Sequence, residues 1–129
     1  MNEVENESES VKTPPTQYVL VIGKAVDGEL VNPARAGCAL SFEGESHYVL
    51  KLSMFPHQKY YLVKNKDSTT QYTVFSRRVV DAAAREGVRF QNPVGSGRLS
   101  PEIKSYMEIR FPLLFGSIFM NLFPVSQST

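Results

Sequence analysis

Residues 59–78, KYYLVKNKDSTTQYTVFSRR, predict a β-hairpin and with it a β-rich fold. Both ends of this stretch are rich in Tyr, Val, Thr and Phe, which favour the pleated and half-buried surface of a sheet. The polar residues 65–69 between them include Asn, Asp and Ser, whose side chains bond back to the local backbone and reverse the chain. We therefore expect strands over 59–64 and 70–80, joined by a short turn.

Six further segments have the pattern of strands. Apolar residues alternate or run together in each, and glycine or polar linkers separate them. In one segment Tyr48, Leu50, Leu52 and Met54 share an apolar face, which we expect to point into the core. The six segments are 18–22, 38–42, 47–55, 88–90, 106–111 and 117–123.

Three segments depart from the strand pattern. Over 24–37 the strong turn signal Asp27-Gly28 predicts a short hairpin followed by a loop. Residues 79–86, VVDAAARE, predict one or two helical turns that end at a glycine. Residues 91–101 contain two prolines and two glycines and are expected to form a loop.

Together these segments predict a mainly β fold. Seven to eight short strands with frequent turns and one short helix are typical of a small antiparallel barrel of the OB type or of a curved sandwich. An α+β arrangement is the alternative. The 129 residues are enough for one domain with its own core, which we place at residues 17–129.

Residues 1–16 differ from the rest in composition and charge. They carry four Glu and one Lys, whereas residues 17–129 carry 13 basic and 9 acidic side chains. With few apolar residues, they are expected to be a disordered acidic tail. The chain shows neither a signal peptide nor an apolar run of about 20 residues, and its single cysteine cannot form an internal disulfide. A cytoplasmic location without a membrane span is therefore expected.

The basic and aromatic residues of the 59–78 hairpin are candidates for a binding surface. Aromatic rings stack on bases of any sequence, and Lys and Arg neutralise phosphates. The simpler alternative is an ordinary sheet surface, whose lysines discourage edge-to-edge aggregation. The candidates for contact with nucleic acid or another partner are Lys59, Tyr61, Lys64, Lys66, Tyr72, Thr73, Phe75, Arg77, Arg78 and, beyond the hairpin, Arg98; Tyr61, Lys64, Lys66, Thr73 and Arg77 are expected to point outward.

The C-terminal stretch 111–124, FPLLFGSIFMNLFP, is the most apolar part of the chain. Burial of each large side chain is worth about 1.5–3 kcal/mol, so most of them are expected in the core. The alternative is self-association as a homodimer through Phe115, Phe119 and Phe123.

The sequence has no complete catalytic, metal or cofactor motif. Cys38, His47 and His57 can supply a thiolate or an imidazole, but they lack metal-ligand spacing. Cys38 lies in an apolar strand, where a small buried residue is usual, and its pairing with a histidine stays open. Residues 92–98, NPVGSGR, permit backbone contacts to an anion but lack phosphate-loop spacing, so a turn is favoured. We expect no cofactor and no enzymatic activity.

The sequence thus predicts a non-enzymatic binding or accessory module. One version binds single-stranded nucleic acid through the basic and aromatic hairpin. The other binds or assembles with a protein through a sheet edge or the Phe-rich C-terminal strand. Salt distinguishes them, because contacts to phosphates weaken steeply with salt and apolar interfaces do not.

Overall fold

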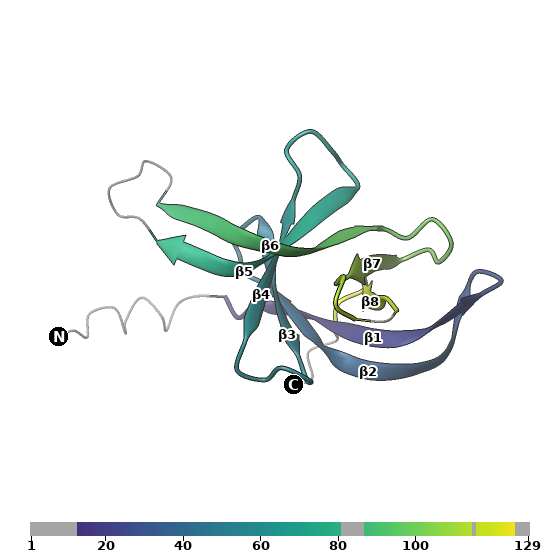
Figure 1. The fold of residues 1–129 in the computed structure, drawn as a ribbon. Coiled ribbons are helices and arrows are strands. Elements are labelled where there is room, and N and C mark those ends of the chain that lie inside the picture. The colour runs from purple at the N-terminus through teal and green to yellow at the C-terminus, as the bar shows by residue number, and fades with distance from the viewer. Residues whose placement is uncertain (1–12, 81–86, 115, 126–129) are drawn as a thin grey trace.

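The computed structural model describes residues 13–80, 87–114 and 116–125. Eight antiparallel strands form one closed barrel (Figure 1), which confirms the mainly β fold and the antiparallel barrel. The strands are β1 (Thr16–Val26), β2 (Glu29–Ser41), β3 (His47–Leu52), β4 (Lys59–Lys64), β5 (Gln71–Val80), β6 (Val88–Leu99), β7 (Tyr106–Arg110) and β8 (Ile118–Asn121).

The strand order is an up-and-down meander. Each strand pairs with its neighbours in the chain, and β1 pairs with β8 to close the ring. An OB fold is a five-stranded Greek-key barrel, so this small barrel differs from it in strand number and strand order. The reason lies in the connections, because each strand reverses directly into the next one along the chain.

Apolar side chains fill the barrel. Leu20, Leu62, Ile109 and Met120 are fully buried, as is Leu50 from the 47–55 segment, whose inward face was predicted. The expectation fails at the end of the 47–55 segment. Here Met54 is 68% exposed, because β3 ends at Leu52 and the chain turns away from the core.

The first predicted loop is a strand instead. Asp27 and Gly28 form the expected turn, with φ angles of 52° and 82°, the positive values that tight hairpin turns require. However, β2 continues through Pro33 without a break. Pairing between β2 and β3 ends at Gly37 and Leu52, so Pro33 lies on an edge where its missing N–H removes no ladder bond.

The second predicted loop, residues 91–101, also belongs mostly to a strand, since β6 runs to Leu99. Pro93 sits at a shift of register where β6 bulges, with Val94 as the extra residue. A Cβ atom at Gly95 would lie 2.5 Å from the Arg110 carbonyl oxygen, and one at Gly97 would lie 3.0 Å from Leu62 Cδ1. Both glycines therefore permit close packing rather than a loop.

Two expectations reach residues that the structure does not describe. Of the predicted helix 79–86, Val79 and Val80 belong to β5, and 81–86 lie outside the described residues. Of the predicted tail 1–16, residues 1–12 lie outside them, and Thr16 already begins β1. The described part of the chain contains no helix long and apolar enough to cross a membrane.

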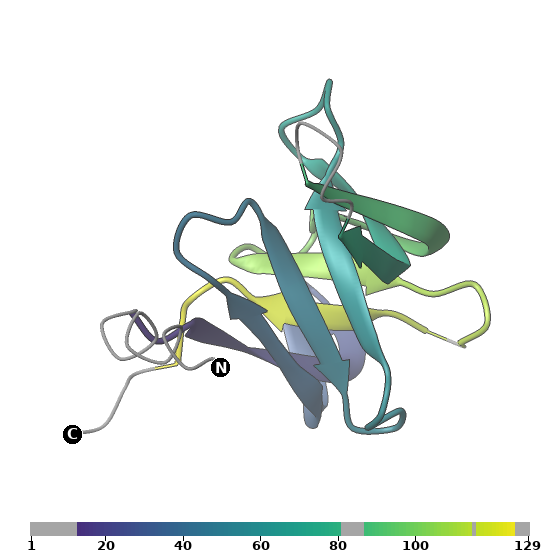
Figure 2. The same cartoon turned by 90° about the vertical axis from the view of Figure 1, so that its left-hand side faces the viewer.

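Two hairpins extend beyond the barrel. In Figure 1 the β1–β2 hairpin extends to one side and the β5–β6 hairpin to the other, and Figure 2 shows the barrel from the side of the β5–β6 hairpin. These extensions matter because the closed ring offers backbone edges only where a hairpin runs past its neighbours.

Candidate functional site

A row of side chains crosses the outer face of the barrel. Ala39, Leu50, Leu62 and Val74 are buried in the core, so the residues beside them point outward. The strand register places these outward residues directly opposite one another on four successive strands. The row consists of Leu40 on β2, Val49 on β3, Tyr61 on β4 and Phe75 on β5.

The β5–β6 hairpin packs over this row. Its two strands stay paired as far as Val80 and Val88. Phe90 of the hairpin lies with its ring centroid 5.6 Å from that of Tyr61 and 4.8 Å from that of His47. These aromatic contacts hold the hairpin as a wall above the outer face of β3 and β4.

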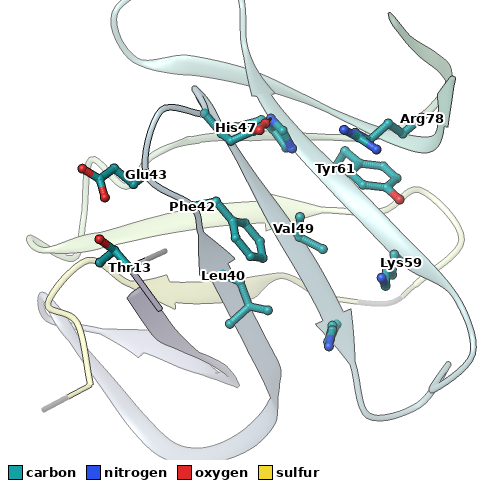
Figure 3. A pocket seen from close by; sticks show the side chains of 11 residues that line it. Thr13, Leu40, Phe42, Glu43, His47, Val49, Lys59, Tyr61 and Arg78 are labelled. Carbon is teal, nitrogen blue, oxygen red and sulfur yellow. Dashed lines mark ion pairs between the residues drawn. The ribbon is translucent and has the colours of Figure 1, made fainter. Parts of the chain in front are cut away.

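A groove of about 560 Å³ lies between this wall and the connection from β2 to β3 (Figure 3). Leu40 and Val49 form its floor together with Phe42, whose side chain is 37% exposed. Tyr61 and Thr13 line opposite sides of the groove (Figure 3). An apolar floor with one open aromatic ring is suited to a flat organic group.

Three cations line the same groove. Lys51 on β3 lies directly opposite Lys59 on β4, and Arg78 comes from the β5–β6 hairpin. Within the described residues, none of the three forms an ion pair with a carboxylate. Like charges directly opposite each other destabilise a sheet, so this side of the groove favours an anion.

Two carboxylates lie at the other end. Glu43 and Glu45 come from the β2–β3 connection and line the groove beside Phe42. Glu45 Oε1 is 3.5 Å from Nδ1 of His47, and no ion pair to a lysine or arginine neutralises either carboxylate among the described residues. The groove therefore separates the carboxylate of Glu43 from the cations of Lys59 and Arg78 (Figure 3).

His47 is the one buried polar side chain recorded in the described core, at 7% exposure. Burial lowers its pKa below 6.5, Glu45 opposes this shift, and the positive charge of Arg78 adds to it. At neutral pH the imidazole is therefore uncharged, and it does not cancel the charge of Glu45.

A contrasting cluster lies elsewhere on the barrel. Glu108 on β7 accepts hydrogen bonds from Arg98 at 3.1 Å, Arg110 at 3.3 Å and the Ser117 hydroxyl at 2.6 Å. Partial burial raises the pKa of Glu108, but these hydrogen bonds and the charge of Arg110 outweigh it and hold the pKa below 4.5. Both arginines are thereby paired with a single carboxylate.

The structure divides the predicted binding residues. Lys59, Tyr61 and Arg78 line the groove, and Phe75 extends its row of side chains. The other predicted residues are placed apart from the groove lining. Among these, Tyr72 packs against the core, Thr73 donates to Asn65 Oδ1, Arg98 pairs with Glu108, and Lys64, Lys66 and Arg77 are exposed.

The prediction also missed residues that lie in the groove. Phe42, Lys51 and the pair Glu43 and Glu45 come from the β2–β3 hairpin rather than from the 59–78 hairpin. Alternation in 47–55 puts Lys51 on the face opposite to the core, and this was the signal in the sequence that Lys51 is available for binding. Its position opposite Lys59 depends on strand register, which alternation alone does not reveal.

A second, more apolar groove of about 630 Å³ lies elsewhere on the surface. It is lined by Met54 and Phe55 after β3, by Ile22 of β1 and by Leu113 after β7, which is 94% exposed. The residues predicted for self-association lie outside this lining: Phe119 is 6% exposed and packs within the chain's own fold, Phe123 is 68% exposed, and Phe115 lies outside the described residues.

The remaining candidates for chemistry are dispersed. Cys38 is half-buried opposite Lys51, while His47 lies opposite Val63. The described residues contain no group of three His, Cys, Asp or Glu side chains that could hold a metal ion. Residues 92–98 lie within β6, so they form a paired strand rather than a turn or an anion cradle.

No family model, no curated protein and no solved structure matches this chain.

Proposed function

We propose that this protein is a non-enzymatic module that binds single-stranded nucleic acid in the groove beside the β5–β6 hairpin. Bases would lie on the floor formed by Leu40, Phe42 and Val49, where the open ring of Phe42 offers a stacking surface. Phosphates would contact Lys51 and Lys59 on the opposite side.

The observation that best supports this proposal is the cross-strand pair of Lys51 and Lys59. The register holds these two ammonium groups on neighbouring strands with no carboxylate partner among the described residues. Their mutual repulsion is a cost to the sheet that a bound phosphate would remove. Arg78 adds a third uncompensated cation from the hairpin above.

Two features favour a single strand over a duplex. The β5–β6 hairpin encloses the groove on one side, since Phe90 of this hairpin packs on Tyr61 and His47. Stacking on Phe42 also requires an unpaired base whose face is free. No sequence preference is needed for these contacts, since every base has a flat face.

The test is fluorescence anisotropy with a labelled oligonucleotide of about 15 nucleotides, titrated at about 50 and 200 mM salt. We expect saturable binding that weakens steeply at the higher salt. Phe42→Ala should reduce affinity by about 1–3 kcal/mol, the usual contribution of one stacked base. Phe55→Ala, at the other groove, is the matched control. Absence of binding at the lower salt would contradict the proposal.

A second candidate function is protein binding or self-association through the more apolar groove. Its support is the exposure of Met54 and Leu113, since such patches often mark protein interfaces. Association there would depend little on salt. Sedimentation of the wild type and of Leu113→Asp tests it, because an unchanged mass would count against this surface. Protein binding through the backbone edges of the two long hairpins, or through Phe123, stays a prediction. The cytoplasmic location also stays a prediction.

A further inference from the structure

We propose that the groove selects cytosine and adenine, which carry an amine at C4 and C6 respectively, over uracil, thymine and guanine, which present a carbonyl at the same position, an inference that rests on the proposed binding of single strands. The groove presents two separated kinds of charge, and a nucleotide with an amino group is complementary to both. Its phosphate is an anion, and the far edge of its base donates hydrogen bonds.

The first step is the orientation of the strand. Figure 3 shows Lys59 and Arg78 on one side of the groove and Glu43 on the other. Lys51, which is opposite Lys59 in register, and Glu45, which is beside His47, also line the groove. The carboxylates repel phosphates, so the backbone of a bound strand runs along the cationic side. A base that projects from it crosses the floor and directs its edge toward the carboxylates.

The second step is the chemistry at that edge. A carboxylate only accepts hydrogen bonds, so it pairs with the N4 amine of cytosine or the N6 amine of adenine. Uracil and thymine present O4 there, and two acceptors facing each other repel. Glu43 and Glu45 are available for this role, since no hydrogen bond from another described side chain occupies either one apart from the contact to His47.

The third step concerns His47, which could otherwise compete for Glu45. Its Nδ1 lies 3.5 Å from Oε1 of Glu45, a distance too long for a strong hydrogen bond. The side chain of Glu45 is 44% exposed, so an incoming amine can reach it from the groove. His47 thus limits where Glu45 sits without occupying its acceptor sites.

The experiment compares labelled oligo-dC and oligo-dU of about 15 nucleotides at neutral pH and about 50 mM salt, because these pyrimidines share one ring and differ in the amine or carbonyl at C4 and in the proton at N3. We expect the wild type to bind oligo-dC about fivefold more tightly or better. The double variant Glu43→Gln/Glu45→Gln should lose this preference, since an amide both donates and accepts. The control Glu29→Gln/Glu102→Gln makes the same change of charge at exposed positions away from the groove and should keep the preference.

Each outcome is decisive. Equal, salt-dependent binding of both oligonucleotides would overturn the selectivity and leave the proposed function standing. Preference for oligo-dU, or a preference for oligo-dC that survives in the groove double variant, would overturn the role of the two carboxylates. Binding of neither oligonucleotide would overturn the proposed function and the selectivity with it.

Discussion

The Lys51–Lys59 pair and the Arg98–Glu108 pair occupy equivalent positions in the fold and have opposite electrostatics. Each consists of two residues directly opposite each other on neighbouring antiparallel strands. Opposite Arg98 the neighbouring strand supplies the carboxylate of Glu108, which also accepts hydrogen bonds from Arg110 and Ser117. In the groove both strands supply lysine. Basic residues of the same sheet therefore either stabilise the fold or stay available for a ligand, depending on the residue opposite.

The largest effect on binding is expected when the two sets of cations are removed separately. Lys51→Ala/Lys59→Ala should weaken binding of a single-stranded oligonucleotide about fiftyfold at about 50 mM salt and reduce the salt slope by about 1.4, because two phosphate contacts are lost. Arg98→Ala/Arg110→Ala makes the same change of charge and should leave affinity within about twofold, since screening weakens distant charges. Anisotropy titrations measure both, and equal losses would show that net charge alone drives binding.

The backbone beneath Lys51 gives the next prediction. A Cβ atom at Gly37 would overlap the carbonyl oxygen of Lys51. Gly37→Ala should therefore lower the free energy of unfolding by about 3 kcal/mol, because β2 and β3 must separate. Urea denaturation measures this loss.

The control for Gly37 is Gly44→Ala. Gly44 has a φ of 84° and open space around it, so alanine there meets backbone strain without a clash, at about 1 kcal/mol. If both variants were equally stable, close packing of β2 on β3 would not position Lys51.

Replacement of Glu108 tests the neutralised cluster. Glu108→Gln should lower the free energy of unfolding by about 1 kcal/mol at neutral pH, because the charged hydrogen bonds to two exposed arginines are weakened. The folded pKa lies below 4.5, so this contribution is complete above pH 4.5 and is lost as the pH falls through the folded pKa.

Urea denaturation over a range of pH measures the difference between wild type and Glu108→Gln, which should shrink at acid pH. Glu29→Gln, at an exposed position in β2, is the control and should change stability little. A difference that grows as the pH falls would contradict the assigned role of the Glu108 carboxylate.

The smallest effect on stability is expected when the Lys51–Lys59 pair is changed into an opposite-charge pair like Arg98–Glu108. Lys51→Glu creates an opposite-charge pair with Lys59 and should raise the free energy of unfolding by about 0.5 kcal/mol. The same variant should bind the oligonucleotide more weakly than Lys51→Ala does, since it repels phosphate. A loss of both stability and affinity would indicate that repulsion between the two lysines is not the cost that a ligand relieves.

The two regions also show which parts of the site could be predicted. Residues 106–111 were correctly predicted as a strand, and the structure buries Met107 and Ile109 on its inner face, with Glu108 between them. The 59–78 hairpin was correctly predicted as two strands, and it contributes Lys59, Tyr61 and Arg78 to the groove. Arg98 was assigned to the same surface because it is basic, although its register partner is Glu108.

The errors in the fold have a common cause. Residues 24–37 and 91–101 were expected to contain loops because proline and glycine normally interrupt strands. In the barrel Pro33 lies on an edge, Pro93 lies at a bulge, and Gly95 and Gly97 allow neighbouring groups to approach closely. These roles depend on the neighbouring strands of the folded barrel, so they cannot be predicted from the local conformational preferences of proline and glycine.

By itself the sequence determined the β-rich fold, the hairpin turns and the inward faces of several strands, because apolar alternation and turn residues act over a few neighbouring positions. The tertiary structure decided the closure of β1 on β8, the packing of Phe90 over His47 and Tyr61, and the meeting of Lys51 with Lys59. Each of these depends on register between strands, and a shift by one residue would turn the same side chains to the opposite face.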